Sequence, residues 1–206
     1  MLFTSISPDA FDHKNISKDI HEMNDHIKNL LVNAPPSHEI PFDVLQEIRR
    51  QGGGLLAFQP YSDRAENRQV GIGDHKVMIR IINHDSPDFI YMHIHGGGHC
   101  IGAADMQDQS LEKISNDLNC VVVSVEYRLA PTNPYPAAPD DCETAAVWLI
   151  ENSMKEFNTE KIVIGGESAG ANLSAVTLLR LKSKGMLDTI KGANLIYGSY
   201  DARLTP

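Results

Sequence analysis

One serine stands where the residue pattern combines a buried strand, a glycine turn and a helix. The run Ile162-Val163-Ile164 has the β-branched character of a strand inside a parallel sheet, and the residues Gly-Glu-Ser-Ala-Gly follow at positions 166–170. Apolar residues then recur at near-helical spacing as far as Leu181. A serine at such a turn is lifted clear of the sheet beside backbone N–H groups that can stabilise an oxyanion. The pattern predicts Ser168 as a nucleophile, although a glycine turn can also bind phosphate or only reverse the chain.

A second glycine stretch upstream favours the nucleophile over a purely structural turn. The segment from Phe89 to His95 is typical of a strand, and Gly96-Gly97-Gly98 follows it. Lipases and esterases use a His-Gly-Gly-Gly loop after the third strand as one half of an oxyanion hole. The two half-sites stand in the order that this chemistry requires.

Four motifs together resemble one enzyme family. They are His95-Gly96-Gly97-Gly98, the Glu-Tyr-Arg-Leu-Ala-Pro run at 126–131, Pro136-Ala137-Ala138 and the serine turn at 166–170. Their order and spacing are similar to those of the α/β-hydrolase fold, specifically its hormone-sensitive-lipase-like carboxylesterases. That family commonly has Asp where Glu167 stands and Gly where Ala171 stands, and we interpret both differences as tolerated variation.

The resemblance implies a serine hydrolase that acts on carboxylic esters with short to medium acyl chains. Ser168 would attack the ester carbonyl, while the N–H groups of Gly97, Gly98 and Ala169 hold the oxyanion. His95 and Gly96 would support the oxyanion loop. The expected partner is a small-molecule ester, with no cofactor. The alternative from a different class is a non-catalytic ligand-binding or partner-binding scaffold on the same fold.

The rest of the expected catalytic triad is not found after the serine. In this fold the acid and the histidine follow the nucleophile along the chain, yet all nine histidines, from His13 to His99, precede Ser168. Asp201 occupies a position that a few relatives use for the acid. We therefore expect this chain to be the N-terminal portion of a longer esterase, without its last strands, second cap segment, triad acid and histidine.

Two other polar groups invite a role. His93, His95 and His99 suggest a metal site, but the glycines between them serve close backbone approach and no carboxylate or cysteine spacing completes a ligand set, so no metal is expected. Glu126 and Arg128 follow a buried strand, and the resemblance favours a buried structural ion pair between them.

Hydrophobic periodicity divides the chain into a helical segment at 1–52, which the resemblance implies is a cap, and an α/β core at 53–206. Apolar residues recur at helical intervals from Ser7 to Val32, a second helix starts near Pro41, and Gly52-Gly53-Gly54 ends it. Helices that simply cover the core are the alternative to a cap. Strands and helices then alternate, which predicts a mostly parallel sheet with helices on both faces. Later helices are expected from Asp105 and Pro139, and the sixth strand at 193–197.

Composition restricts the possible partners. The 206 residues are 42% hydrophobic and 22% charged, which is typical of one soluble globular core, and the net charge of -9 argues against nucleic acid or an anionic membrane. No apolar segment is long enough to span a bilayer and the N-terminus lacks a secretory pattern, so we expect a cytoplasmic protein. Cys100, Cys120 and Cys142 are expected to be reduced thiols. An apolar edge at the sixth strand suggests self-association into a homo-oligomer.

Overall fold

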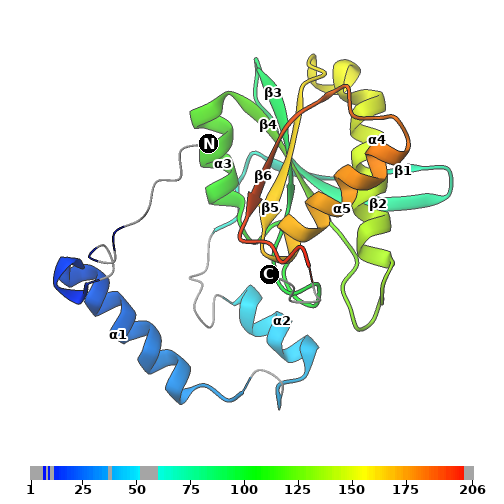
Figure 1. The fold of residues 1–206 in the computed structure, drawn as a ribbon. Helices are drawn as coiled ribbons and strands as arrows, with labels where there is room; N and C mark the ends of the chain where they lie inside the picture. Colours follow the sequence, from blue (N-terminus) through cyan, green and yellow to red (C-terminus); the bar gives the residue numbers. More distant parts are fainter. Residues whose placement is uncertain (1–6, 8, 10–11, 37–38, 52–59, 202–206) are drawn as a thin grey trace.

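A six-stranded sheet forms the centre of the computed structural model, which describes residues 7, 9, 12–36, 39–51 and 60–201 (Figure 1). Its strands are β1 (Ala65–Ile72), β2 (His75–Ile82), β3 (Phe89–Ile94), β4 (Cys120–Glu126), β5 (Ile162–Glu167) and β6 (Ile190–Ile196). They are ordered β1-β2-β4-β3-β5-β6. Strand β2 is antiparallel to both neighbours, whereas β4, β3, β5 and β6 run parallel. The predicted mostly parallel sheet is confirmed, and β1 and β2 form an antiparallel pair at one of its edges.

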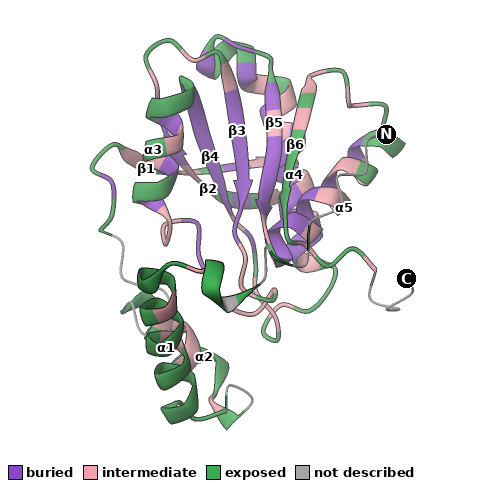
Figure 2. Cartoon of the chain, turned by 60° about the vertical axis from the view of Figure 1, so that its left-hand side comes forward, coloured by how far each residue is buried: buried purple, intermediate pink, exposed green. Residues whose placement is uncertain are grey.

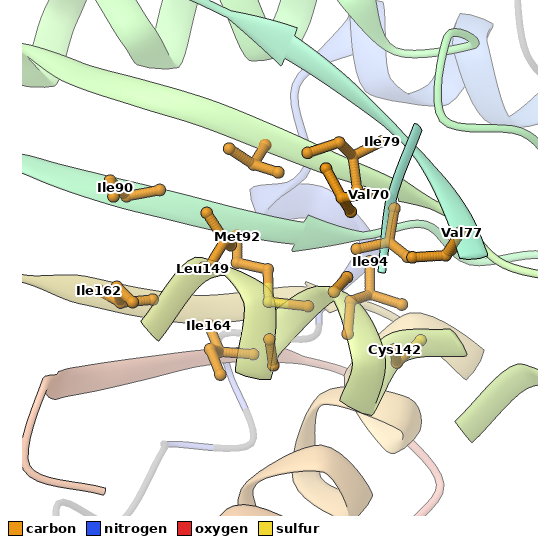
Figure 3. Packing of buried hydrophobic residues seen from close by; sticks show 14 of the residues in the cluster. Val70, Val77, Ile79, Ile90, Met92, Ile94, Cys142, Leu149, Ile162 and Ile164 are labelled. Atoms are coloured by element: carbon orange, nitrogen blue, oxygen red, sulfur yellow. The ribbon is translucent and has the colours of Figure 1, made fainter. Parts of the chain in front are cut away.

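Helices cover both faces of this sheet, as predicted. On one face α4 (Ala137–Phe157) and α5 (Ala169–Ser183) pack against Ile90, Met92 and Ile94, and Figure 3 shows these three side chains within the larger core cluster. On the other face α3 (Asp108–Leu118) packs its Leu111 in the smaller cluster with Tyr91. Because successive strand residues point to opposite faces, one strand supplies side chains to both clusters. The central strands are therefore buried on both sides, which holds their carboxyl ends in a fixed arrangement.

In the α/β core, the starts of two helices and one strand differ from those expected. Helix α3 starts at Asp108 instead of Asp105. The side chain of Asp108 is buried, and its carboxylate accepts hydrogen bonds from Arg80 and from the N–H of Ser62. Helix α4 starts at Ala137, two residues before Pro139, because a proline is tolerated within the first helical turn. Strand β6 starts at Ile190 because it pairs with β5 from Ile162 onward. Tertiary pairing thus extends β6 through Gly192, a residue that weakens strands locally.

The N-terminal helices are α1 (Lys18–Asn33) and α2 (Phe42–Arg50), and neither contains a buried residue (Figure 2). The expected helix start at Ser7 is wrong: a short turn of 3-10 helix at His13–Asn15 comes first, and the extended backbone of Ser17 then caps α1. The expected break at Gly52-Gly53-Gly54, and with it the 52/53 domain boundary, lies outside the described residues. A cap formed by these helices stays a prediction.

Candidate active site

Ser168 lies at the junction of strand β5 and helix α5, in a backbone conformation that side chains rarely adopt. Its φ is 54° and its ψ is -118°. Its N–H donates to the carbonyl oxygen of Ile196 at 2.9 Å, and its own carbonyl accepts the N–H of Asn172 at 3.1 Å. The side chain is exposed. A positive φ at a non-glycine residue stores strain that only a rigid surrounding structure can maintain, which is typical of functional turns.

Two glycines let this turn pack directly onto the end of β3. A Cβ atom at Gly166 would lie 2.0 Å from the carbonyl oxygen of Ile94, and one at Gly170 would lie 1.9 Å from the same oxygen. Real Cβ atoms never approach so closely, so no side chain fits at either position. The carboxyl end of β3 and the serine turn are therefore in backbone contact, and the loop that follows β3 is placed beside Ser168.

The loop after β3 has a backbone conformation that requires glycine. Gly97 and Gly98 have φ values of 129° and 61°. A Cβ at Gly97 would lie 1.9 Å from the carbonyl oxygen of Ile101. The carbonyl of Gly97 accepts the N–H groups of Cys100 and Ile101 at 3.1 and 3.0 Å. The loop thus folds back on itself through backbone hydrogen bonds.

Glu167, next to the nucleophile, connects the two loops, a role that the sequence interpretation missed. One carboxylate oxygen accepts the N–H of Gly96 at 2.6 Å and the side-chain amide of Gln107 at 2.7 Å. The other lies 3.1 Å from Nε2 of His93. Burial alone raises the pKa of Glu167, but the hydrogen bond and charge of His93 and the N–H of Gly96 outweigh it and lower the pKa to about 2. Glu167 is therefore an ionised brace; the only sequence signal was its place inside the serine turn.

His95 contacts the backbone of the same loop. Its Nδ1 donates to the carbonyl of Gly96 at 2.9 Å, and its ring stacks on Tyr127 with the ring centroids 4.1 Å apart. Tyr127 in turn donates its hydroxyl to the carbonyl oxygen of His95 at 2.8 Å. Burial lowers the pKa of His95 to about 4, so the imidazole is neutral at pH 7. These contacts fit the supporting role predicted for His95.

The two loops line a cleft of about 460 Å³ at the carboxyl edge of the sheet. Its lining includes Ser168 together with four residues predicted for the site, namely His95, Gly96, Gly97 and Gly98. The fifth, Ala169, is buried at the first position of α5. The structure thus brings the predicted site residues together. Their assignment as oxyanion donors stays a prediction.

The expected ion pair between Glu126 and Arg128 is wrong. Arg128 binds the buried carboxylate of Asp141 through its backbone N–H and its guanidinium, with distances between 2.8 and 3.1 Å. Glu126 instead accepts the N–H of Ala104 at 2.6 Å. Strand β4 ends at Glu126, so Arg128 no longer follows the strand alternation and turns toward helix α4.

The three clustered imidazoles have separate surroundings. Nδ1 of His93 lies 3.0 Å from the Ser124 hydroxyl, His95 stacks on Tyr127, and His99 lines a different, mostly apolar cavity. Among the residues that the structure describes, no three histidine, cysteine or acidic side chains are gathered to hold a metal ion.

No histidine side chain in the described part of the chain forms a hydrogen bond with the hydroxyl of Ser168. His93 is bound to Ser124 and Glu167, and Nε2 of His95 is fully buried. His38 lies outside the described residues. Within the described ranges, Ser168 therefore has no histidine hydrogen-bonded to it that could act as a general base.

Comparison with known proteins decides the family. A family model described as alpha/beta hydrolase fold matches residues 91–206, more than half of the chain. The chain belongs to the α/β-hydrolase fold family. Within this family it is similar to an arylesterase of Saccharolobus solfataricus, with 35% identity over 140 residues that cover 65% of this chain and 46% of the relative. It is also similar to the carboxylesterase NlhH of Mycobacterium tuberculosis, with 37% identity over 120 residues that cover 55% of this chain and 37% of the relative.

Solved structures agree with this assignment to the α/β-hydrolase family. A hyperthermophilic esterase from Pyrobaculum calidifontis superposes with a TM-score of 0.73 at 26% identity, covering 89% of this chain and 59% of that chain. The chain thus spans less than two thirds of the length of each of these relatives.

Proposed function

We propose that this α/β-hydrolase chain carries the nucleophile and the oxyanion loop of a carboxylic ester hydrolase. The observation that carries the proposal is the strained backbone of Ser168, which presents an exposed hydroxyl to the cleft that the glycine loop also lines. The similarity of the chain to proteins named arylesterase and carboxylesterase supports the same activity. Strain of this kind serves no purpose in a simple turn, because a glycine at position 168 would remove it.

The chemistry proceeds through an acyl-enzyme. Oγ of Ser168 forms a bond to the ester carbonyl carbon while a general base takes the hydroxyl proton, and the N–H groups of Gly97, Gly98 and Ala169 hold the carbonyl oxygen as it gains charge. The carbon–oxygen bond to the alcohol then breaks, and the alcohol leaves with the proton. Water attacks the acyl-enzyme, which releases the carboxylic acid and restores the serine.

The general base and its acid come from outside the described residues in this proposal. A serine without its base loses most of its rate but keeps the contribution of the oxyanion hole and of substrate binding. From the sequence we expect residues 1–206 to be the N-terminal portion of a longer esterase, which we call the intact protein. Residues 1–206 alone are therefore expected to hydrolyse a short-chain nitrophenyl ester more slowly than the intact protein by orders of magnitude. Rapid Ser168-dependent turnover by residues 1–206 alone would show that a base lies among them.

Labelling of the intact protein with a fluorophosphonate tests the nucleophile. We expect one phosphonyl group, located on Ser168 by peptide mass spectrometry, and its loss in Ser168→Ala. Ser183→Ala, which alters an exposed serine at the end of α5, is the matched control and should label normally. An unlabelled Ser168 in a folded intact protein that binds esters without turnover would establish the scaffold alternative instead.

The compartment and the assembly of the protein are further proposals. The three cysteines are free thiols, which fits a reducing cytoplasm. No helix in the described part of the chain has the length and hydropathy that a bilayer crossing requires.

Strand β6 forms an edge of the described sheet and exposes Leu195 and Ile196, which supports self-association through this edge. Light scattering of the purified protein would measure the assembly directly.

A further inference from the structure

Helix α2 brings two arginines to the cleft that contains Ser168. Arg49 and Arg50 both line this cleft, together with the glycine loop and the nucleophile. Figures 1 and 2 show α2 on the side of the sheet where the parallel strands have their carboxyl ends. The cleft is therefore bounded by a cationic element that the ester-hydrolysis chemistry itself does not use.

One residue of α2 determines which face of the helix points to the cleft. The side chain of Gln46 donates to the carbonyl of Gly102 at 2.7 Å and accepts the N–H of Gly102 at 2.8 Å. Residues three and four positions apart share one face of a helix, so Arg49 and Arg50 lie on the face that Gln46 fixes. Gly102 has no room for a Cβ, which would lie 2.6 Å from the carbonyl oxygen of Gly96. The helix is thus attached to the same backbone that forms the oxyanion loop.

The two arginines differ in their partners. The guanidinium of Arg50 lies 3.8 Å from the carboxylate of Asp105. The guanidinium of Arg49 forms no hydrogen bond and no ion pair with any residue that the structure describes. The nearby carboxylate of Glu167 is already occupied by His93, Gly96 and Gln107. The guanidinium of Arg49 thus lines the cleft without a carboxylate partner of its own among the described residues.

A cation in the last turn of a helix has a simpler explanation, because it stabilises the carboxyl end of the helix dipole even in open solvent. That explanation does not require Arg49 to lie in the cleft wall, partly buried and near His95. The charge of Arg49 is one of the influences that lower the pKa of His95, which places the guanidinium within electrostatic range of the oxyanion loop. A partly desolvated arginine at this position is suited to a carboxylate, which it can bind through two parallel hydrogen bonds.

We propose that the cleft selects esters that carry a second, anionic group, and that Arg49 binds that group as a carboxylate. This inference rests on the proposed ester hydrolase, since it names the substrate class of the same site. Half-esters of short dicarboxylic acids have the required chemistry. Arg49 acts in specificity and takes no part in bond breaking.

Binding to the intact protein with Ser168→Ala tests this without turnover. The probes are monomethyl glutarate, which is anionic at pH 7, and the neutral dimethyl glutarate, both measured by titration calorimetry. We expect the half-ester to bind about five- to tenfold more tightly than the diester, and added Arg49→Gln to remove that preference. Raising the salt concentration should weaken the binding of the half-ester more than the binding of the diester.

Two matched variants distinguish a direct contact between Arg49 and the ligand carboxylate from a general effect of positive charge in the cleft. Arg50→Gln makes the same change in net charge on the adjacent residue and should keep most of the preference, whereas Arg49→Lys should retain part of it. Equal binding of the two probes, failure of the half-ester to bind, or a preference that survives Arg49→Gln would overturn the inference. A loss of the half-ester preference in Arg50→Gln as large as that in Arg49→Gln would also overturn it.

The proposed hydrolase is examined separately by fluorophosphonate labelling of protein that retains Ser168. Labelling without any charge preference leaves the hydrolase and removes the anion site. A charge preference that depends on Arg49, without labelling, supports the anion site and removes the hydrolase.

Discussion

The serine turn and the N-terminal helices border one cleft but are held in place in different ways. Around Ser168 the backbones of β3, β5 and α5 touch, since Gly166 and Gly170 leave no space for a side chain beside the Ile94 carbonyl. Helix α2 has no buried residue, and in the described part of the chain Gln46 binds it to Gly102 and Arg50 adds an ion pair of 3.8 Å with Asp105. Dense backbone contact fixes the position of Ser168, whereas a few polar contacts orient helix α2 beside it. The proposed nucleophile and the proposed anion site therefore lie in regions that are held in place by different kinds of contact.

The largest effect should follow from adding one methyl group beneath the nucleophile. In Gly170→Ala the new Cβ would meet the Ile94 carbonyl oxygen at 1.9 Å, so the turn or the end of β3 must move. We expect the free energy of unfolding, measured by urea denaturation, to fall by about 3 kcal/mol. Gly192→Ala is the matched control, because its Cβ would have only one neighbour, at 4.0 Å. Equal stability of the two variants would show that the serine turn accepts an added methyl group as readily as strand β6 does.

A second prediction concerns the charge that joins the two loops. The pKa of Glu167 is lowered to about 2, against roughly 4.3 in an unfolded chain, so its stabilisation is fully present above about pH 4.3 and is lost as the pH falls toward 2. Glu167→Gln cannot titrate. We therefore expect the stability difference between the wild type and this variant to shrink by about 2 kcal/mol between pH 5 and pH 2.5.

The measurement for Glu167 is urea unfolding at several pH values. Glu151→Gln, which alters an exposed carboxylate on α4, controls for the change in net charge. A pH-independent difference between wild type and Glu167→Gln would mean that the carboxylate does not brace the loop.

A smaller effect is expected where α2 is attached. Gln46→Ala removes two hydrogen bonds to Gly102 and should loosen α2 by about 1 kcal/mol, with little change in global stability. Hydrogen exchange should then be faster for the amides of α2 but not for those of β3. The control is Gln51→Ala, because among the described residues the side chain of Gln51, just after α2, is hydrogen-bonded to Glu47 alone. Faster exchange throughout β3 would instead couple the helix to the sheet.

The smallest effect should occur in α1. Leu31 is 57% exposed, so Leu31→Ala should change the free energy of unfolding by less than about 0.5 kcal/mol. Leu149 of α4 is fully buried, and Leu149→Ala should cost about 3 kcal/mol. A large loss in Leu31→Ala would show that α1 packs against something in solution, and the contrast between the two regions would no longer hold.

Local patterns were sufficient for the elements that carry the chemistry. The apolar run before Gly166, the glycines after His95 and the alternating residues of β1 and β2 each specify a local conformation, and strand, turn and hairpin follow from steric rules within a few residues. Ser168 and its loop could be predicted for the same reason.

Only the tertiary structure decided which distant groups meet. Arg128 pairs with Asp141 instead of Glu126, because β4 ends before Arg128 and the packing of α4 brings Asp141 to it. Glu167 reaches Gln107, and Gln46 reaches Gly102 across 56 positions of sequence. Such contacts depend on strand register and on how helices lie over the sheet, whereas residue periodicity records only which face of each element is apolar. For that reason the sequence by itself predicted Ser168 as the nucleophile, and the fold alone showed which charged groups lie around it.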